Sequence, residues 1–493
     1  MDQSVLILFA IFIPIVLGVY LLARPDYKSR VSLVANASVG FAITTVLSLV
    51  ILIEGDLRLD VFTIGKNMNI YFHVDDMSRV FGTIVTIVMP LVGIYAFEYM
   101  SHYKKEEKRF FGFFLMVYGV LLALTYAGNV VTFYLFYELM SLSSVPLVFH
   151  FRSREAIMAG LKYLFYSLCG AYFVLFGIYF LNQYTITLDF VAGGTLNMAR
   201  VAGSEGLLLV VAMSMIIGFG VKAGMIPLHA WLPNAHPIAP APASAALSSL
   251  IVKMGVFGVM RVVYYLFGAE FLRGTWVQYT WLTLTLITVF FGSMMAYREK
   301  QFKKRLAYST VSQVSYILFG MALMQSQALI GSVLHILFHA VIKSALFLSA
   351  GAIIYKTGVE RVDEMRGIGK KMPKIMWSFT LCSLALIGIP PASGFISKWY
   401  LATGSLATEI PVIAWLGPVV LLVSALLTAG YLLPIAIDGF FPGPDFDYKH
   451  LEKKDPTKQM IVPIMILAAL AVLFGVLPNP VISYVTELVA SVL

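Results

Sequence analysis

Apolar stretches long enough to cross a lipid bilayer follow one another along this 493-residue chain and leave no room for a soluble domain between them. Of its residues 59% are hydrophobic and 12% charged, whereas a soluble domain has about 25% charged residues. Because lipid offers no partner to backbone polar groups, spans of this length fold as α-helices. We therefore expect an all-α polytopic membrane protein of about fourteen helices. The candidate spans lie near residues 4–23, 32–53, 77–99, 110–127, 130–150, 156–181, 206–231, 241–267, 277–297, 304–324, 329–355, 374–403, 412–437 and 459–490.

The 35 Lys and Arg residues fall mainly on alternate connections between these spans. Twenty-four lie on every second connection, starting with residues 24–30. Five lie on the connections in between, and six lie within spans. Cytoplasmic connections of membrane proteins carry the excess of Lys and Arg. We therefore place the first set in the cytoplasm and both termini on the outer side of the cell membrane. The net charge of +9 then reflects orientation and indicates no nucleic-acid partner.

Some connections have recognisable features. Residues 57–62 and 69–74 flank Gly65-Lys66-Asn67, a pattern that predicts a small extracytoplasmic β-hairpin. On the cytoplasmic side, 356–374 and 438–458 are the larger polar connections. Either could dock a cytoplasmic partner, although we favour solvated linkers.

Two spans carry a lysine beside prolines that must interrupt the helix. Lys222 lies five residues before Pro227, and Lys398 lies seven residues after the second proline of the Pro390-Pro391 pair. A charge at bilayer depth costs at least about 2.5 kcal/mol, so such residues are usually functional. The two spans are the seventh and the twelfth, so they cross the membrane in opposite directions. This arrangement indicates an inverted repeat with a repeated ion site, as in a transporter or an ion-translocating subunit.

The chain then divides into four parts. Residues 1–109 hold the first three helices and the hairpin, 110–267 form the first repeat with helices four to eight, and 268–437 form the second with helices nine to thirteen. Residues 438–493 add a cytoplasmic loop and the last helix.

Further charged residues lie inside the spans. Glu138 is the one acidic residue that we place deep in a span; it either makes a structural salt bridge or tunes a neighbouring lysine, because a nearby carboxylate favours the charged amine. Lys253 is deep enough to join the same path as Lys222. Lys162 is ambiguous, and Arg261 is interpreted as a structural residue near the outer end whose charged head extends to the interface.

The segment HILFHAVIK places His335, His339 and Lys343 on one helical face. The histidine spacing could bind zinc, but no third ligand is evident. Because imidazole titrates near neutral pH, we favour a proton relay over a packed polar core. Lys398 is interpreted as a further relay or an outlet.

No cofactor or metal site is expected in this chain. Its two cysteines, Cys169 and Cys382, are fewer than the four thiolates that usually hold an iron–sulfur cluster. The glycines of 218–224 follow no strand and lack the dinucleotide-binding spacing, so helix packing explains them better.

Four segments in order carry a family resemblance: GFGVKAGMIPLHAWLPNAHPIAPAPASA, RLAYSTVSQVSYI, HILFHAVIKSALFL and IGIPPASGFISKWY. They resemble the antiporter-like membrane subunits shared by respiratory complex I, Mrp-type Na+/H+ antiporters and energy-converting membrane-bound hydrogenases. The likeness covers nearly the whole chain and is densest over residues 110–404. It implies fourteen helices, two inverted five-helix repeats and a hydrated proton path across the middle of the membrane.

The resemblance also implies roles for single residues. Glu138 matches the fifth-helix glutamate, Lys222 its seventh-helix partner and Lys253 the eighth-helix connector. His335 and His339 match the eleventh-helix relay, and Lys398 matches the terminal lysine of the path. Two departures are visible: Asn234 replaces a common aspartate, and the lysine at 398, where other types have glutamate, is closest to the Mrp D and complex I N types.

The sequence therefore predicts a proton- or Na+/H+-translocating subunit of a multisubunit membrane complex. Its expected partners are other membrane subunits, including antiporter-like sisters, and a cytoplasmic redox module of the hydrogenase or complex I kind. Iron–sulfur clusters or metal centres would lie in those partners. The alternatives are an Mrp D-type Na+/H+ antiporter component without redox coupling, a non-pumping membrane scaffold, and a self-contained solute carrier.

Overall fold

A computed structural model of the chain describes residues 3–24, 29–64, 68–103, 106–444, 446–447 and 455–493. The turn predicted at 65–67 and part of the predicted cytoplasmic loop 438–458 lie outside the described residues. The helices are α1 (Val5–Ala23), α2 (Arg30–Glu54), α3 (Asp76–Tyr99), η1 (Met100–Tyr103), α4 (Glu107–Thr125), α5 (Val130–Val148), α6 (Arg154–Tyr184), α7 (Met198–Val201), α8 (Glu205–Ala223), α9 (Leu232–Ile238), α10 (Ala241–Ala246), η2 (Leu247–Ile251), α11 (Val252–Met260), η3 (Arg261–Phe267), α12 (Ala269–Leu272), α13 (Trp276–Arg298), α14 (Phe302–Ala322), α15 (Ser326–Thr357), η4 (Val362–Glu364), α16 (Ile368–Lys371), α17 (Pro373–Ile387), α18 (Ser393–Leu406), α19 (Pro411–Phe440), α20 (Lys458–Val476) and α21 (Asn479–Ala490).

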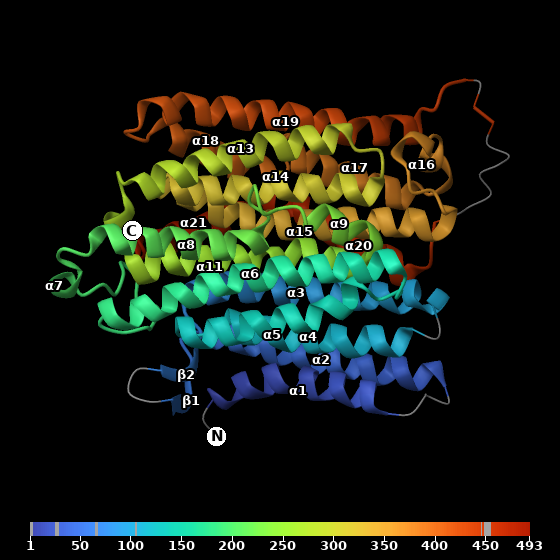
Figure 1. The fold of residues 1–493 in the computed structure, drawn as a ribbon. Helices are drawn as coiled ribbons and strands as arrows, with labels where there is room; N and C mark the ends of the chain where they lie inside the picture. Colours follow the sequence, from blue (N-terminus) through green and yellow to red (C-terminus); the bar gives the residue numbers. More distant parts are fainter. Residues whose placement is uncertain (1–2, 25–28, 65–67, 104–105, 445, 448–454) are drawn as a thin grey trace.

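The long helices lie side by side in one bundle (Figure 1). Within the described residues, twelve helical segments are long and apolar enough to cross a membrane. These twelve do not include α14, which begins with several cations, or the shorter pair α17 and α18. The prediction of a helical, polytopic membrane protein is confirmed.

The bundle has two distinct ends (Figure 1). Strands β1 (Arg58–Ile64) and β2 (Met68–His73) pair antiparallel, with Arg58 opposite His73, and lie at the same end as α7 and the C-terminus. We call this the sheet end. The connection that holds α16 lies at the opposite end, the α16 end.

Both predicted helix breaks are present. Helix α8 ends before Gly224 and α17 ends before Gly388, and both glycines adopt the left-handed conformation that commonly ends helices, with φ of 80° and 95°. Pro227 lies between α8 and α9, and the pair Pro390-Pro391 lies between α17 and α18. Each break therefore combines a glycine that ends the helix with prolines that cannot continue it.

Two predicted spans differ in detail from the structure. The span expected at 459–490 is divided into α20 and α21, because Pro478 and Pro480 lack the backbone N–H that a continuous helix needs. The span expected at 241–267 is one continuous helical segment, but its stretches η2 and η3 are π-helical. Nothing in the local sequence distinguishes these wider turns from ordinary helix.

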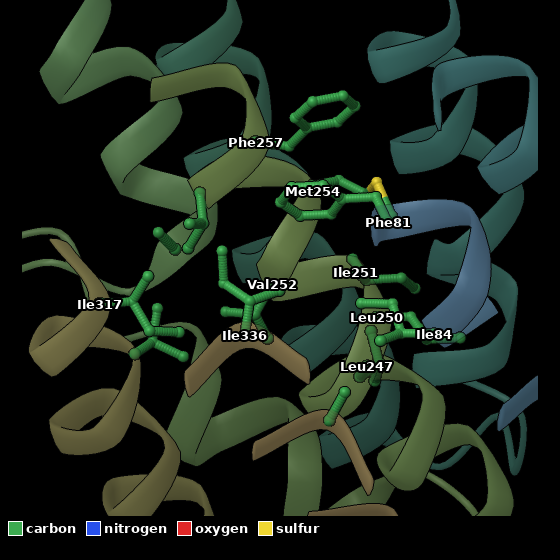
Figure 2. Close-up of a cluster of buried hydrophobic side chains, with 14 of the residues drawn as sticks. Phe81, Ile84, Leu247, Leu250, Ile251, Val252, Met254, Phe257, Ile317 and Ile336 are labelled. Atoms are coloured by element: carbon green, nitrogen blue, oxygen red, sulfur yellow. The ribbon is translucent and has the colours of Figure 1, made fainter. Parts of the chain in front are cut away.

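The centre of the bundle surrounds the segment η2–α11. The membrane-spanning window of 241–267 is 100% buried, and that of α15 is 94% buried, whereas that of α19 is only 28% buried. Figure 2 shows apolar side chains of η2 and α11 packed with residues of α3, α14 and α15. The rings of Phe81 and Phe257 stack at 4.1 Å there. The helix that carries Lys253 is thus enclosed on all sides by protein.

Candidate functional site

Lys222 lies in the last turn of α8, directly before the helix break, and is fully buried. Its Nζ donates hydrogen bonds to three hydroxyl oxygens, those of Ser141 at 2.8 Å, Tyr163 at 3.0 Å and Ser167 at 2.7 Å. The nitrogen also lies 4.3 Å from the centre of the Tyr163 ring, which attracts a cation. These contacts satisfy all three donors of an ammonium group. Helices α5 and α6 thus build a polar cage around Lys222 inside an apolar bundle.

Glu138 lies on α5, three residues before Ser141, and is half-buried. Its charge acts on Lys222, but no ion pair links the two side chains within the described part of the chain. One carboxylate oxygen of Glu138 is buried without a hydrogen-bond partner among the described residues. The structure therefore places Glu138 within electrostatic reach of Lys222 while hydroxyl groups make the direct contacts. Its tuning role stays a prediction.

Lys253 and Lys343 occupy the centre of the bundle, and both are fully buried. The Nζ of Lys253 donates to the carbonyl oxygen of Ser248 in η2 at 2.6 Å. The Nζ of Lys343 donates to the Leu306 carbonyl oxygen at 3.0 Å and to the Ser309 hydroxyl at 2.7 Å. The charge of Lys343 acts on Lys253. Both amines are held by neutral oxygens, so either can gain or lose a proton without breaking an ion pair.

The two histidines of α15 lie between the central lysines and Lys398. The rings of His335 and His339 are stacked with centres 5.6 Å apart, and the Nδ1 of His335 lies 2.9 Å from the Ser397 hydroxyl. Within the described residues, neither ring nitrogen of His339 has a hydrogen-bond partner. The charges of Lys253, Lys343 and Lys398 all act on His339. The charges of Lys398 and Lys253 act on His335 as well, so both histidines lie between cations.

Lys398 lies in the second turn of α18, and its Nζ reaches back to the other half of the broken helix. It donates to the carbonyl oxygens of Leu386 at 2.6 Å and Ile387 at 3.0 Å, which end α17. The last carbonyls of a helix have no partner within it and carry partial negative charge. The break after α17 therefore supplies the acceptors for this lysine.

The helix that carries Lys222, α8, contacts α11, which carries Lys253. A methyl group added at Gly255 of α11 would lie 3.0 Å from the Cβ of Lys222. The helices of Lys222 and Lys253 are therefore in direct contact. We call the predicted residues on these adjoining helices the polar row: its members Lys222, Lys253, Lys343, His339 and His335 are buried, and Lys398 at its end is half-buried.

The row has no metal-binding geometry in the part of the chain that the structure describes. No group of three or more His, Cys, Asp or Glu side chains is gathered there. The pair His335 and His339 thus has no further ligand of these types among the described residues.

Several cations differ from their predicted places. Lys303 and Arg305, predicted on a cytoplasmic connection, are buried in α14, where Lys303 donates to the Ala239 carbonyl oxygen at 2.9 Å and Arg305 to that of Tyr431 at 2.8 Å. Arg261 does not extend to the interface: it is 1% exposed and bonds Asp75. Each is buried because the fold supplies an acceptor that the local sequence does not reveal.

Sequence reasoning also missed the hydroxyl groups that hold the row. They are Ser141, Tyr163, Ser167, Ser309 and Ser397. The spacing of Tyr163 and Ser167, one helical turn apart, was the available signal. It is weak, because hydroxyls in membrane helices usually bond a carbonyl of their own helix.

The family "NADH:quinone oxidoreductase/Mrp antiporter, TM" matches residues 127–437, and "NADH-Ubiquinone oxidoreductase (complex I), chain 5 N-terminus" matches residues 62–111. This chain belongs to the NADH:quinone oxidoreductase/Mrp antiporter family. It is 33% identical to the N-type subunit of the NADH-quinone oxidoreductase of Desulforudis audaxviator, over 81% of both chains. It is 28% identical to the D-type subunit of the Na(+)/H(+) antiporter of Alkalihalophilus pseudofirmus, over 99% of this chain and 97% of the relative.

The fold is similar to that of a chain in the structure of the Mrp complex from Dietzia sp. DQ12-45-1b. The TM-score is 0.83 at 21% identity, over 99% of this chain and 97% of that chain. The family of antiporter-like membrane subunits is thus shown, as the four sequence segments predicted. A membrane subunit of ion-translocating type fits these relatives.

Proposed function

We propose that this chain moves protons across the membrane as one subunit of a multisubunit complex. The observation that carries the proposal is the polar row of buried and half-buried lysines and histidines, in which the lysine amines are bonded to hydroxyl and carbonyl oxygens. An inert scaffold would be as stable or more stable with apolar residues in place of buried charges. The row therefore has a use beyond stability.

In this proposal protons pass between Lys222, Lys253, His339 or His335, and Lys398, with Lys343 beside the central step. Each transfer leaves the donor neutral and the acceptor charged, so one excess proton moves along the row at a time. Glu138 favours the charged form of Lys222 when it approaches and disfavours it when it withdraws.

The proposed membrane arrangement has fourteen crossings, counting α14 and the broken pair α17–α18 as spans. The inverted repeats are residues 110–267 and 268–437, supported by the two broken helices that each end on glycine before proline. Residues 1–109, with the first three helices, and residues 438–493, with the cytoplasmic loop and the last helix, lie outside the two repeats. The α16 end is cytoplasmic, and the sheet end with both termini is outside, in keeping with the positive charge on the α16-side connections.

The energy source separates two forms of this function. In the first, the complex carries a cytoplasmic redox module with iron–sulfur clusters or metal centres, and its electron transfer drives the protons. The second is an Mrp-type Na+/H+ exchanger without redox coupling. Relatives that match over almost the full length of both chains include components of both kinds, a Na(+)/H(+) antiporter subunit and an NADH-quinone oxidoreductase subunit. Mass spectrometry of the native complex in mild detergent distinguishes them by the presence of redox subunits.

The test of proton movement uses the assembled complex in sealed vesicles. Lys222→Ala and Lys398→Ala should each abolish ion transport while the complex still assembles. Lys162→Ala is the matched control, because Lys162 is a lysine of α6 outside the row. Undiminished transport in both row variants would reject the proposal.

A further inference from the structure

An apolar groove, which we call the α15 groove, opens on the surface of the bundle between α3, α15, α20 and α21. Its volume is about 300 Å³, and its lining includes Thr83 of α3, Leu337 and Phe338 of α15 and Val481 of α21. Ligand pockets in proteins have volumes of about 300–1,000 Å³. Beside it, Val476 of the membrane-spanning helix α20 is 55% exposed. The groove therefore opens on a surface that faces acyl chains.

The inner part of the groove reaches the helix that carries the histidines of the polar row. Leu337 and Phe338 stand between His335 and His339 in the sequence of α15. The Phe338 side chain is buried, and its ring stacks on that of Phe474 of α20 with centres 5.8 Å apart. A molecule in the groove would thus pack against the helix of the proposed relay.

One end of the groove is charged. Arg79 of α3 lines it, and the Nη1 of Arg79 lies 3.4 Å from the Oδ1 of Asp76. The Tyr484 hydroxyl of α21 donates to the backbone carbonyl oxygen of Asp76 at 3.1 Å. The side chains of Arg79 and Asp76 are 35% and 55% exposed, so both can bind a further partner. Because α3 begins just after β2, this charged end is at the sheet end, where a lipid headgroup would lie.

The charges around Arg79 fit a zwitterion better than an anion. A methyl group added at Gly55 would lie 3.4 Å from the Cζ of Arg79, so the end of α2 is beside the guanidinium. Two acids, Glu54 and Asp56, flank Gly55 in the sequence, and Asp76 lies on α3. A headgroup with negative charge alone would meet these acids unfavourably. A phosphate joined to an ammonium group offers an anion to Arg79 and a cation to Asp76.

We propose that the α15 groove binds one phosphatidylethanolamine molecule of the membrane leaflet at the sheet end. The phosphate accepts hydrogen bonds from the Arg79 guanidinium, and the ammonium group donates to the Asp76 carboxylate. One acyl chain lies in the groove against Thr83 and Phe338. A choline headgroup has no N–H to donate to Asp76, so it fits less well. This lipid site does not depend on the proposed proton transport.

The test uses the assembled complex in nanodiscs that contain a phosphatidylethanolamine with a photoreactive diazirine at the end of one acyl chain. Mass spectrometry of peptides after illumination should find adducts in the segments that hold Phe338 and Phe474. Arg79→Gln and Asp76→Asn should each weaken this labelling about fivefold, as for the loss of one hydrogen bond. Val481→Trp fills the groove and should remove the adducts. Diazirine probes with phosphatidylcholine or phosphatidylglycerol headgroups should label about fivefold less.

A second apolar groove provides a matched control. It lies between α6 and α8, has a volume of about 370 Å³ and is lined in part by Tyr172, Phe176 and Val210. No charged side chain belongs to its lining among the residues that the structure describes. The three headgroups should therefore label it equally, and Val210→Trp should leave the labelling of the α15 groove unchanged.

Two outcomes would overturn the proposal. Equal labelling of the α15 groove by all three headgroups, with no effect of Arg79→Gln or Asp76→Asn, would show that it holds unselected bulk lipid. Absence of adducts there, while the control groove is labelled, would show that a neighbouring subunit covers it. Lys222→Ala, which should abolish transport, should keep the full labelling, so the failure of either proposal is seen separately.

Discussion

The ion pair between Arg261 and Asp75 offers the sharpest prediction of stability. The guanidinium binds the carboxylate through two contacts of 2.5 and 2.7 Å and also donates to the Ser78 hydroxyl at 3.1 Å. The rings of Phe257 and Tyr265 cover it at 4.8 and 4.4 Å. Arg261 follows the helix that carries Lys253, so this pair fixes the central helix to the start of α3.

The expected magnitude follows from the burial of the two groups. Their side chains are 2% and 22% exposed, so removing one partner leaves an uncompensated charge largely out of water. Breaking a buried pair in this way costs about 3–5 kcal/mol. Arg261→Met keeps the apolar contacts and removes only the charge, and we expect a loss in that range. In Asp75→Asn the side-chain oxygen still caps α3 through the Ser78 N–H, and the unpaired Arg261 should cost a similar amount.

The double variant tests the reasoning, because it leaves neither charge unpaired. Its loss of unfolding free energy should be clearly smaller than the sum of the single losses. The assay is a reversible denaturant titration in mixed micelles, with Asp76→Asn as control. Asp76 pairs with Arg79 at 3.4 Å through exposed side chains, and such pairs contribute about 0–1 kcal/mol. A loss under about 1 kcal/mol for Arg261→Met, or strict additivity, would refute the argument.

Three further predictions concern packing, the site and pH. Gly255→Ala would place a methyl group 2.7 Å from backbone atoms of α8 and should cost about 1–3 kcal/mol of stability. Gly206→Ala is the control, because open space surrounds Gly206 and the stability should change little. The measurement is the thermal unfolding of the two variants. Ser167→Ala removes one of the three acceptors of the Lys222 amine, and a hydrogen bond to a charged group contributes about 1.5–3 kcal/mol. Ion transport should therefore slow at least about tenfold. Ser214→Ala is the control and should leave transport unchanged, because the exposed Ser214 hydroxyl bonds a carbonyl of its own helix. Burial raises the pKa of Asp75, but the charge and hydrogen bonds of Arg261 outweigh burial and hold that pKa below its ordinary value. The stability that this pair contributes is therefore complete above about pH 3.9 and is lost as the pH falls through the lower folded pKa. In denaturant titrations Asp75→Asn should lack this part of the pH dependence. If the unfolding free energy of Asp75→Asn fell with acid as steeply as that of the parent, the argument would be contradicted.

Local features of the structure were predictable because they depend on neighbouring residues. The spans follow from apolar length, and the two helix breaks follow from glycine and proline at 224–227 and 388–391. The two strands near residue 60 follow from alternating apolar residues around a turn sequence. The division of the last span at Pro478 was missed although the signal was local, because membrane helices tolerate proline and the apolar window continues past it.

The site itself was predicted only as a set of residue types. A lysine in an apolar window must find acceptors, so Lys222, Lys253 and Lys398 were visible as candidates. Their acceptors were not: hydroxyl groups make the direct contacts of Lys222, and Glu138 acts on it through its charge. Lys303 was assigned to a connection because the expected span begins at residue 304, whereas α14 begins at Phe302 and includes it.

The sequence by itself determined that this is a helical membrane protein of the antiporter-like family, that the helices beside Lys222 and Lys398 break, and that Lys222, Lys253, Lys343 and Lys398 lie within spans. Only the tertiary structure decided what those charges touch. The hydroxyls around Lys222 lie 55 to 81 residues from it along the chain, and Asp75 lies 186 residues from Arg261. Hydrophobicity and backbone conformation act over a few neighbouring residues, whereas a hydrogen-bond partner at such separations is set by which helix faces pack together.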